Sequence, residues 1–219
     1  MNVTLIHHSG VLIELEHKSL LFDYYEGPLN INLDQPLYIF ASHAHYDHYS
    51  SKIFSIKHPH KTYILSDDIK THHDHVTVSP HHHYTIDDVE IDTLFSTDQG
   101  VAFVIHTEGK SLYFAGDLHF WYWIGEPDQD NNWQRDHYLE EIGHLTNEHF
   151  DLSCVVVDDR LEGAWLYGLE EFLKRVKTDY VLPIHYFGNY NLSKRLKKEF
   201  HTDQTTILYP DHDGYKVVL

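Results

Sequence analysis

The stretch Leu37-Tyr38-Ile39-Phe40-Ala41-Ser42-His43-Ala44-His45-Tyr46-Asp47-His48 joins an apolar run to four potential metal ligands within six residues. The nearly all-apolar residues 37–41 predict a strand buried on both faces. A loop anchored by such a strand can direct its side chains toward one point. Imidazole and carboxylate together suit a divalent first-row metal, Zn²⁺ first among them. The alternative is a solvated histidine-rich loop, since the chain has 22 histidines, but the pattern is much narrower than histidine content alone.

The pattern His-x-His-x-Asp-His at 43–48 resembles the hallmark loop of the metallo-β-lactamase-fold metallohydrolases. Later landmarks of that superfamily follow in order, as Ala115-Gly116-Asp117 and Pro183-Ile184-His185, each after a strand-like run. The resemblance covers nearly the whole chain, from His8-Ser9-Gly10 through Leu21-Phe22-Asp23 to the C-terminal strands. It looks closest to the compact hydrolases without a lid domain, including the branch with a sugar-phosphate lactonase. It implies an α+β fold, a four-layer αββα sandwich of two mixed β-sheets flanked by helices.

Length and composition favour one domain over residues 1–219, because no linker rich in Pro, Gly or Ser divides the chain. The single Cys154 lies in an apolar run, so we expect a buried thiol and a reducing compartment, the cytoplasm. No apolar run approaches the roughly 18 residues that span a bilayer. Residues 3–6 look like a strand, whereas a signal segment would begin with basic residues. We therefore expect no membrane association.

The net charge of −18 argues against a nucleic-acid partner, because a phosphate backbone would meet a repulsive field over most of the surface. Two bound dications would make a pocket locally positive in spite of this charge. The sequence therefore favours a small anionic substrate, and it leaves the oligomeric state open.

Hydrophobic periodicity predicts the secondary structure along the chain. Strands are expected at 3–6, 11–15, 20–23, 37–41, 63–65, 76–78, 89–94, 101–105, 111–114, 152–157, 180–182, 206–209 and 215–218. Helices are expected at 134–145, 166–177 and 192–200, with a short one capped by Ser66-Asp67-Asp68.

The resemblance also implies the ligand set. His43 and His45 would bind a first metal ion. A second ion would be bound by Asp47, His48 and His185, and Asp117 would bridge the two ions. From the residues alone, Asp117 is also a candidate for a turn carboxylate, and His185 for a core histidine.

The chain departs from the family where a histidine usually precedes the strand that begins near Val101. It reads Ser96-Thr97-Asp98-Gln99-Gly100 there. Asp98 is our candidate third ligand, since a carboxylate oxygen binds Zn²⁺ at about 2.0–2.2 Å, much like an imidazole nitrogen. This harder ligand would also raise the tolerance for Mn²⁺ or Fe²⁺. The alternatives are a histidine from 81–83, one of His72, His73 and His75, or no third protein ligand.

Two such ions, about 3.5–4 Å apart, would activate a water molecule without a Ser or Cys nucleophile. Asp47 would orient this water and take its proton. We expect His119 and the tryptophans after Asp117 to form a pocket wall, with His119 as a proton donor, although the same residues would serve equally well as core. Arg160 is a candidate anion clamp or an ordinary ion-pair partner.

The function predicted from these residues is a metal-dependent hydrolase acting on a small, anionic lactone, ester or phosphodiester. Two alternatives stay open. One is a nuclease of the same fold, and the other is a non-catalytic metal-binding protein with an altered site.

Overall fold

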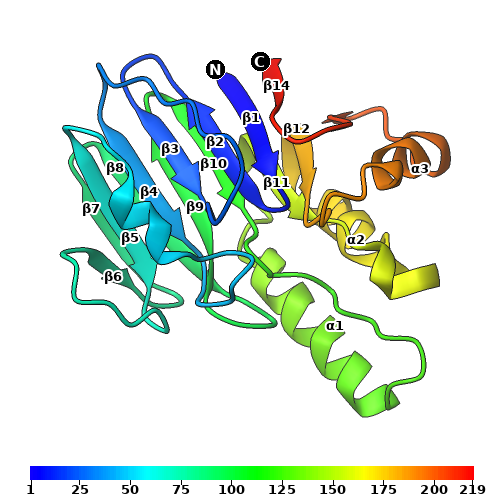
Figure 1. Cartoon of the computed structure of the whole chain (residues 1–219). Coiled ribbons are helices and arrows are strands. Elements are labelled where there is room, and N and C mark those ends of the chain that lie inside the picture. Colours follow the sequence, from blue (N-terminus) through cyan, green and yellow to red (C-terminus); the bar gives the residue numbers. More distant parts are fainter.

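The computed structural model describes residues 1–219, which form two seven-stranded mixed β-sheets packed face to face (Figure 1). The first sheet has the order β14-β1-β2-β3-β4-β5-β6. Its strands are β1 (Asn2–His7), β2 (Gly10–Glu14), β3 (Ser19–Phe22), β4 (Leu37–Ala41), β5 (Lys61–Ser66), β6 (Val76–Val78) and β14 (Tyr215–Val218). Strands β1 to β3 form an antiparallel meander, whereas β3 to β6 are parallel.

The second sheet repeats this plan, with the order β13-β12-β11-β10-β9-β8-β7. Its strands are β7 (His83–Ile86), β8 (Val89–Phe95), β9 (Val101–Thr107), β10 (Lys110–Phe114), β11 (His149–Val156), β12 (Lys177–Ile184) and β13 (Thr206–Ile207). Strands β7 to β10 are antiparallel, and β10 to β13 are parallel.

Aromatic side chains fill the space between the sheets. Phe22 of β3 stacks on Phe40 of β4 and on Phe114 of β10, each with a ring-centroid separation of 4.6 Å. Phe103 of β9 meets Phe40 edge-on at 5.3 Å. All four rings are fully buried, so truncating one of them to Ala would cost about 3–5 kcal/mol.

Helices cover the outer face of the second sheet (Figure 1). They are α1 (Asp128–Gly143), α2 (Tyr167–Arg175) and α3 (Asn191–Glu199). Tyr113 of β10 points away from the other sheet and stacks on Phe172 of α2. The outer face of the first sheet is covered by the 3₁₀ turn η1 (Ser51–Ser55) and its flanking loops. Ile53 and Ile69 of this segment pack against the sheet in a small apolar cluster. The predicted sandwich is thus confirmed. None of the helices is both long and apolar enough to cross a bilayer.

Three local predictions differ from the structure. No helix follows Ser66, because Asp67 and Asp68 lie in a turn whose backbone bonds to Val78. Helix α1 begins at Asp128, six residues before the predicted start, since its first turns are polar and give no apolar periodicity. Strand β7 was not predicted, because its four residues are half-exposed and start inside a histidine run.

Candidate metal centre

The predicted site residues all lie at one edge of the sandwich. Parallel strands end at the same edge of a sheet, so the loops after β4, β10 and β12 deliver His43, Asp117 and His185 to one region. Strand β9 is antiparallel to β10, with Phe103 opposite Phe114, so the loop that precedes β9 brings Asp98 there too. The turn between β1 and β2 adds His8.

Two glycines let these loops approach closely. Gly100 has φ +72°, and a Cβ built on it would lie 2.0 Å from the Ser42 carbonyl oxygen. Gly116 has φ +54°, and its Cβ would lie 2.6 Å from that of Ser42. A side chain at either position would therefore push the Asp98 or Asp117 loop away from the strand that carries His43.

Asp117 lies at the centre of the cluster. Its Oδ1 is 3.2 Å from His48 Nε2 and 3.6 Å from His185 Nε2, and its Oδ2 is 3.6 Å from His43 Nε2. His43 Nε2, His48 Nε2 and Asp117 Oδ1 are buried and have no hydrogen-bond partner. Buried polar atoms without partners are rare, and here they converge on one space.

The opposite ring nitrogens are all held by oxygen atoms. His48 Nδ1 donates to Asp23 Oδ2 at 2.7 Å, and His185 Nδ1 donates to Asp158 Oδ2 at 2.9 Å. The Ser42 hydroxyl donates to Asp23 at 2.6 Å, which leaves its oxygen to accept from His43 Nδ1 at 2.9 Å. With the protons on Nδ1, all three Nε2 atoms present lone pairs toward Asp117, as metal ligands do.

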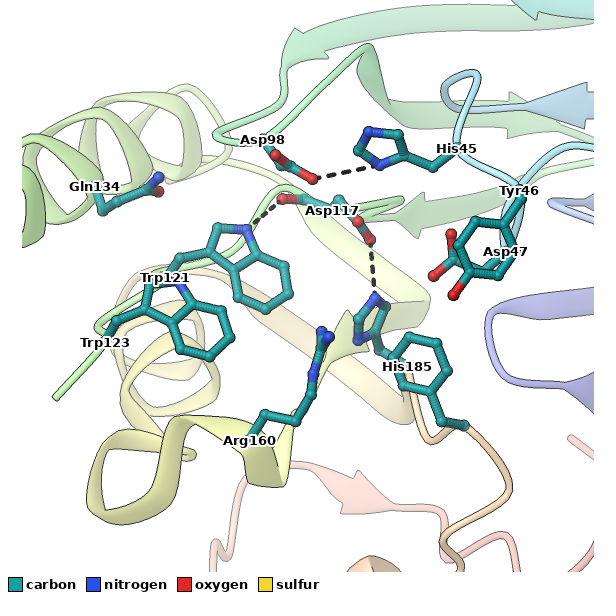
Figure 2. A pocket seen from close by; sticks show the side chains of 11 residues that line it. His45, Tyr46, Asp47, Asp98, Asp117, Trp121, Trp123, Gln134, Arg160 and His185 are labelled. Atoms are coloured by element: carbon teal, nitrogen blue, oxygen red, sulfur yellow. Dashed lines mark hydrogen bonds and ion pairs between the residues drawn. The ribbon is translucent and has the colours of Figure 1, made fainter. Parts of the chain in front are cut away.

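The first group of ligand atoms comprises His43, His45, Asp98 and Asp117, all within 4.8 Å of one another. His45 Nδ1 is 3.5 Å from Asp98 Oδ2, and Figure 2 shows these two side chains facing each other. The competing histidines lie elsewhere, as His81 pairs with Glu141 and His83 with Glu90 and Asp92. The structure thus places Asp98, and none of those histidines, beside His43, His45 and Asp117.

The second group comprises His8, Asp47, His48 and His185. His8 differs from the others, because the Phe187 backbone N–H donates to its Nδ1 at 3.1 Å. The neutral His8 ring must then carry its proton on Nε2, which lies 3.5 Å from Asp47 Oδ2. We therefore interpret His8 as a donor that orients Asp47, not as a ligand.

Burial sets the charge state of the cluster. It lowers the pKa of His43 to about 2, helped by the neighbouring His48, and that of His185 to about 3, so both rings are neutral at pH 7. Burial, followed by the charges of Asp98, Asp23 and Asp47, raises the pKa of Asp117 far above its usual range. Neutral imidazoles around a carboxylate that resists ionisation are the environment that a divalent cation stabilises. The donor set therefore fits the metal ions that the sequence predicts.

A pocket of about 400 Å³ opens beside the cluster. It is lined by His45, Tyr46, Asp47, Asp98, Asp117, Trp121, Trp123, Gln134, Arg160, His185 and Phe187 (Figure 2). Trp121 and Trp123 are parallel to within 5°. The Arg160 guanidinium lies 4.8 Å from the Phe187 ring and also donates to Asp158 through Nε, at 2.9 Å. Arg160 thus makes the ion pair that the sequence allowed and still faces the pocket.

His119 is not part of the pocket wall, in contrast to the expectation from sequence. Its backbone is held by Thr97, whose hydroxyl accepts from His119 N–H at 3.0 Å. The ring points the other way and is fully buried, with neither nitrogen hydrogen-bonded. Burial lowers the pKa of His119 to about 3. A proton donor to substrate must reach the pocket, and this ring does not.

Three carboxylates hydrogen-bond to the candidate ligands or their loops, a role that the sequence did not predict for them. Asp23 and Asp158 follow β3 and β11, next to the strands that deliver the ligands, so the parallel pairing was the available signal. Asp68 accepts from the Ala44 backbone at 2.9 Å and from Gln99 Nε2 at 2.5 Å, which joins the loops of the first ligand group. Asp23, His8 and His185 also have positive φ angles, a strain that functional sites often store.

Comparison with known proteins gives a match in structure only. No protein-family model matches the sequence, and no curated protein does either. The chain is similar to Igni18, a metallo hydrolase from the archaeon Ignicoccus hospitalis (TM-score 0.66, 14% identity, 99% of this chain and 97% of that one covered). It is also similar to the metallo-β-lactamase-fold protein YhfI from Bacillus subtilis (TM-score 0.61, 18% identity, 99% and 98% covered).

A third similar structure is CmlA, a diiron β-hydroxylase from Streptomyces venezuelae (TM-score 0.61, 12% identity), of which the match covers 54%, against 100% of this chain. The chain therefore has the metallo-β-lactamase fold, as its sequence motifs implied.

Proposed function

We propose that this protein is a metal-dependent hydrolase that uses two divalent metal ions to activate water. The observation that carries the proposal is the convergence of three Nε2 atoms on Asp117, from His43, His48 and His185. Those of His43 and His48 are buried without a hydrogen-bond partner, and Asp98 and His45 lie beside them. Zn²⁺ suits this mixed set of nitrogen and oxygen donors, and Asp98 extends the range to Mn²⁺ and Fe²⁺. His43, His45, Asp98 and Asp117 would hold one ion, and Asp47, His48, His185 and Asp117 the other.

The bound ions would supply Lewis acidity, lowering the pKa of water and polarising a substrate oxygen. The protein residues do the rest. Burial alone would raise the pKa of Asp47, but its contact with His8 and the nearby rings hold it below the usual range, so this side chain stays ionised at pH 7. An ionised Asp47 at the pocket surface can orient a water molecule and accept its proton once that proton is made acidic. Trp121 and Phe187 form an apolar part of the pocket wall.

The proposed substrate is a small anionic lactone, ester or phosphodiester. The pocket volume of about 400 Å³ suits a small molecule and not a polymer. Arg160 is the one cationic side chain among the lining residues, and its planar guanidinium can bind a carboxylate or phosphate. The net charge of −18 disfavours a nuclease. We further propose a cytoplasmic location, where a lone thiol such as Cys154 stays reduced.

Metal analysis combined with a turnover panel tests the proposal. Purified protein should hold about two divalent ions per chain and hydrolyse at least one lactone, ester or phosphodiester. The Asp117→Ala variant should lose the second ion and all turnover. One ion per chain with no turnover would favour the metal-binding protein, and tight, steeply salt-dependent RNA binding with cleavage would favour the nuclease.

A further inference from the structure

A second group of metal-ligand side chains lies where the C-terminal end of α1 meets β7 and β8. His81, Glu141 and His144 each offer one ligand atom, and these atoms lie within 4.8 Å of one another. None of the three lines the pocket at the metal centre. We propose that this group is a separate cation site for Zn²⁺ or a chemically similar transition-metal ion.

The distances are close to those that a metal ion requires. His81 Nε2 lies 2.9 Å from Glu141 Oε1 and 3.0 Å from Oε2. Bonds of about 2.0–2.1 Å in a tetrahedral arrangement separate neighbouring ligand atoms by about 3.3 Å. The two side chains would therefore move apart by only a few tenths of an ångström. The Phe95 backbone N–H already donates to Glu141 Oε2 at 3.0 Å, so Oε1 is the atom that would bind the ion.

The third ligand has no other role in the structure. The His144 imidazole makes no hydrogen bond, and its ring centroid lies 5.7 Å from that of His81. Both histidines line a cavity of about 400 Å³ on the surface, so an ion can reach them from solvent. The Glu141 side chain is only 6% exposed, against 54% for His81, so the carboxylate is fixed and the imidazoles can adjust to the ion.

Backbone geometry points to the same site. His81 has φ +60°, a conformation that non-glycine residues rarely adopt, and its N–H bonds to the Thr93 carbonyl at 2.9 Å. This conformation directs the His81 ring toward α1. Strain held in place by the surrounding structure is typical of ligand-binding positions.

A simple ion pair between His81 and Glu141 is the competing explanation, and it gives His144 no part. Two neutral imidazoles and one carboxylate would leave a bound dication with a net charge of +1, which the field of a chain carrying −18 favours. The ion would also fasten α1, which carries Gln134, to the end of β8, three residues before Asp98.

Calorimetric titration of Zn²⁺ into protein already loaded at its tight sites tests the proposal. Wild-type protein should take up one further equivalent with a micromolar dissociation constant. His144→Gln and His81→Asn should each weaken this uptake at least tenfold. Asn is chosen at position 81 because it tolerates the positive φ there. His82→Gln is the matched control, because the imidazole of this exposed neighbour bonds only to the Pro80 carbonyl and the variant should titrate like wild type.

His144→Gln should fold normally, since the imidazole that it replaces is exposed to solvent. Anomalous diffraction at the zinc edge should place an ion among the three side chains of wild-type protein. No further uptake by wild type, or unchanged uptake by His144→Gln, would overturn the proposal. Both results are independent of hydrolysis, because the ligands at the pocket are unaltered in every variant.

Discussion

Replacing Asp23 by Asn should weaken the second metal ion while keeping the shape of the side chain. The carboxylate accepts from the Ser42 backbone at 2.7 Å, the Ser42 hydroxyl at 2.6 Å and His48 Nδ1 at 2.7 Å. An amide oxygen can keep the backbone bond, but its NH₂ group would face two donors. His48 would then favour the tautomer with its proton on Nε2, directed at Asp117 and away from ligation.

The magnitude follows from the lost bonds. Burial raises the pKa of Asp23 to about 7, so the carboxylate is ionised only above that pH. There its two charge-assisted hydrogen bonds contribute roughly 3–6 kcal/mol together, of which the Ser42 hydroxyl can regain about 1 by turning to accept from the amide. The metal-free variant should therefore unfold in urea with a free energy lower by about 2–5 kcal/mol. Loss of an oxygen that orients a ligand typically weakens metal binding about 10–100-fold.

Metal competition against a chromogenic chelator measures this loss for the second ion. Asp151→Asn is the matched control, because it also loses carboxylate bonds, to Ser111 and Lys110, at a distance from the metal centre. It should lose stability but keep both ions. Wild-type affinity for both ions in Asp23→Asn would refute the tautomer argument.

Three further predictions concern other parts of the site. Asp117→Ala should abolish turnover and release at least one ion, and atomic absorption would measure that ion directly. Gly168→Ala should destabilise the protein by about 1–3 kcal/mol in urea, because its Cβ would lie 2.2 Å from His119 Cε1, and adding His119→Ala should recover part of that loss. Metal-free protein should lose stability as the pH falls below about 6.5, since unfolded histidines then bind protons that folded His43, His48, His119 and His185, with pKa values of about 2 to 3, do not. Each histidine contributes up to about 1.4 kcal/mol per pH unit, and the raised pKa values of Asp23 and Asp117 act in the opposite direction and offset about half of the sum. Urea titrations at pH 7.5 and 5.5 would show no difference if the reasoning fails.

The sequence was most informative where function depends on neighbouring residues. Strand β4 is buried along its whole length, and the ligands follow it at once, so an apolar run and a short motif were sufficient. Asp117 and His185 were assigned from the resemblance, because Ala115-Gly116-Asp117 and Pro183-Ile184-His185 match the family's later landmarks and each follows a strand. Parallel pairing then brings these ends together, as a general property of such sheets.

The sequence was less informative where a contact depends on the direction of a side chain. The His48 bond to Asp23 spans 25 residues, and no local pattern indicates it. The ring of His119 could have faced either side of its loop, and only packing against Gly168 decides this. The sequence also left the histidine runs open as alternatives to Asp98 for the third ligand, because strand order, which decides which loop lies at the site, has no local signal. The run at 81–83 leads into the edge strand β7, whereas the β8–β9 loop adjoins β10.

If two dications bind as proposed, an aspartate at position 98 would also change the charge that remains at the site. Four positive charges would be offset by the carboxylates of Asp47, Asp98 and Asp117, leaving an excess of one, whereas an imidazole at position 98 would leave an excess of two. Coulomb attraction for an anionic product scales with that excess. A carboxylate ligand there would therefore shorten the residence of a hydrolysed, negatively charged product, and favour release over retention at the end of each cycle.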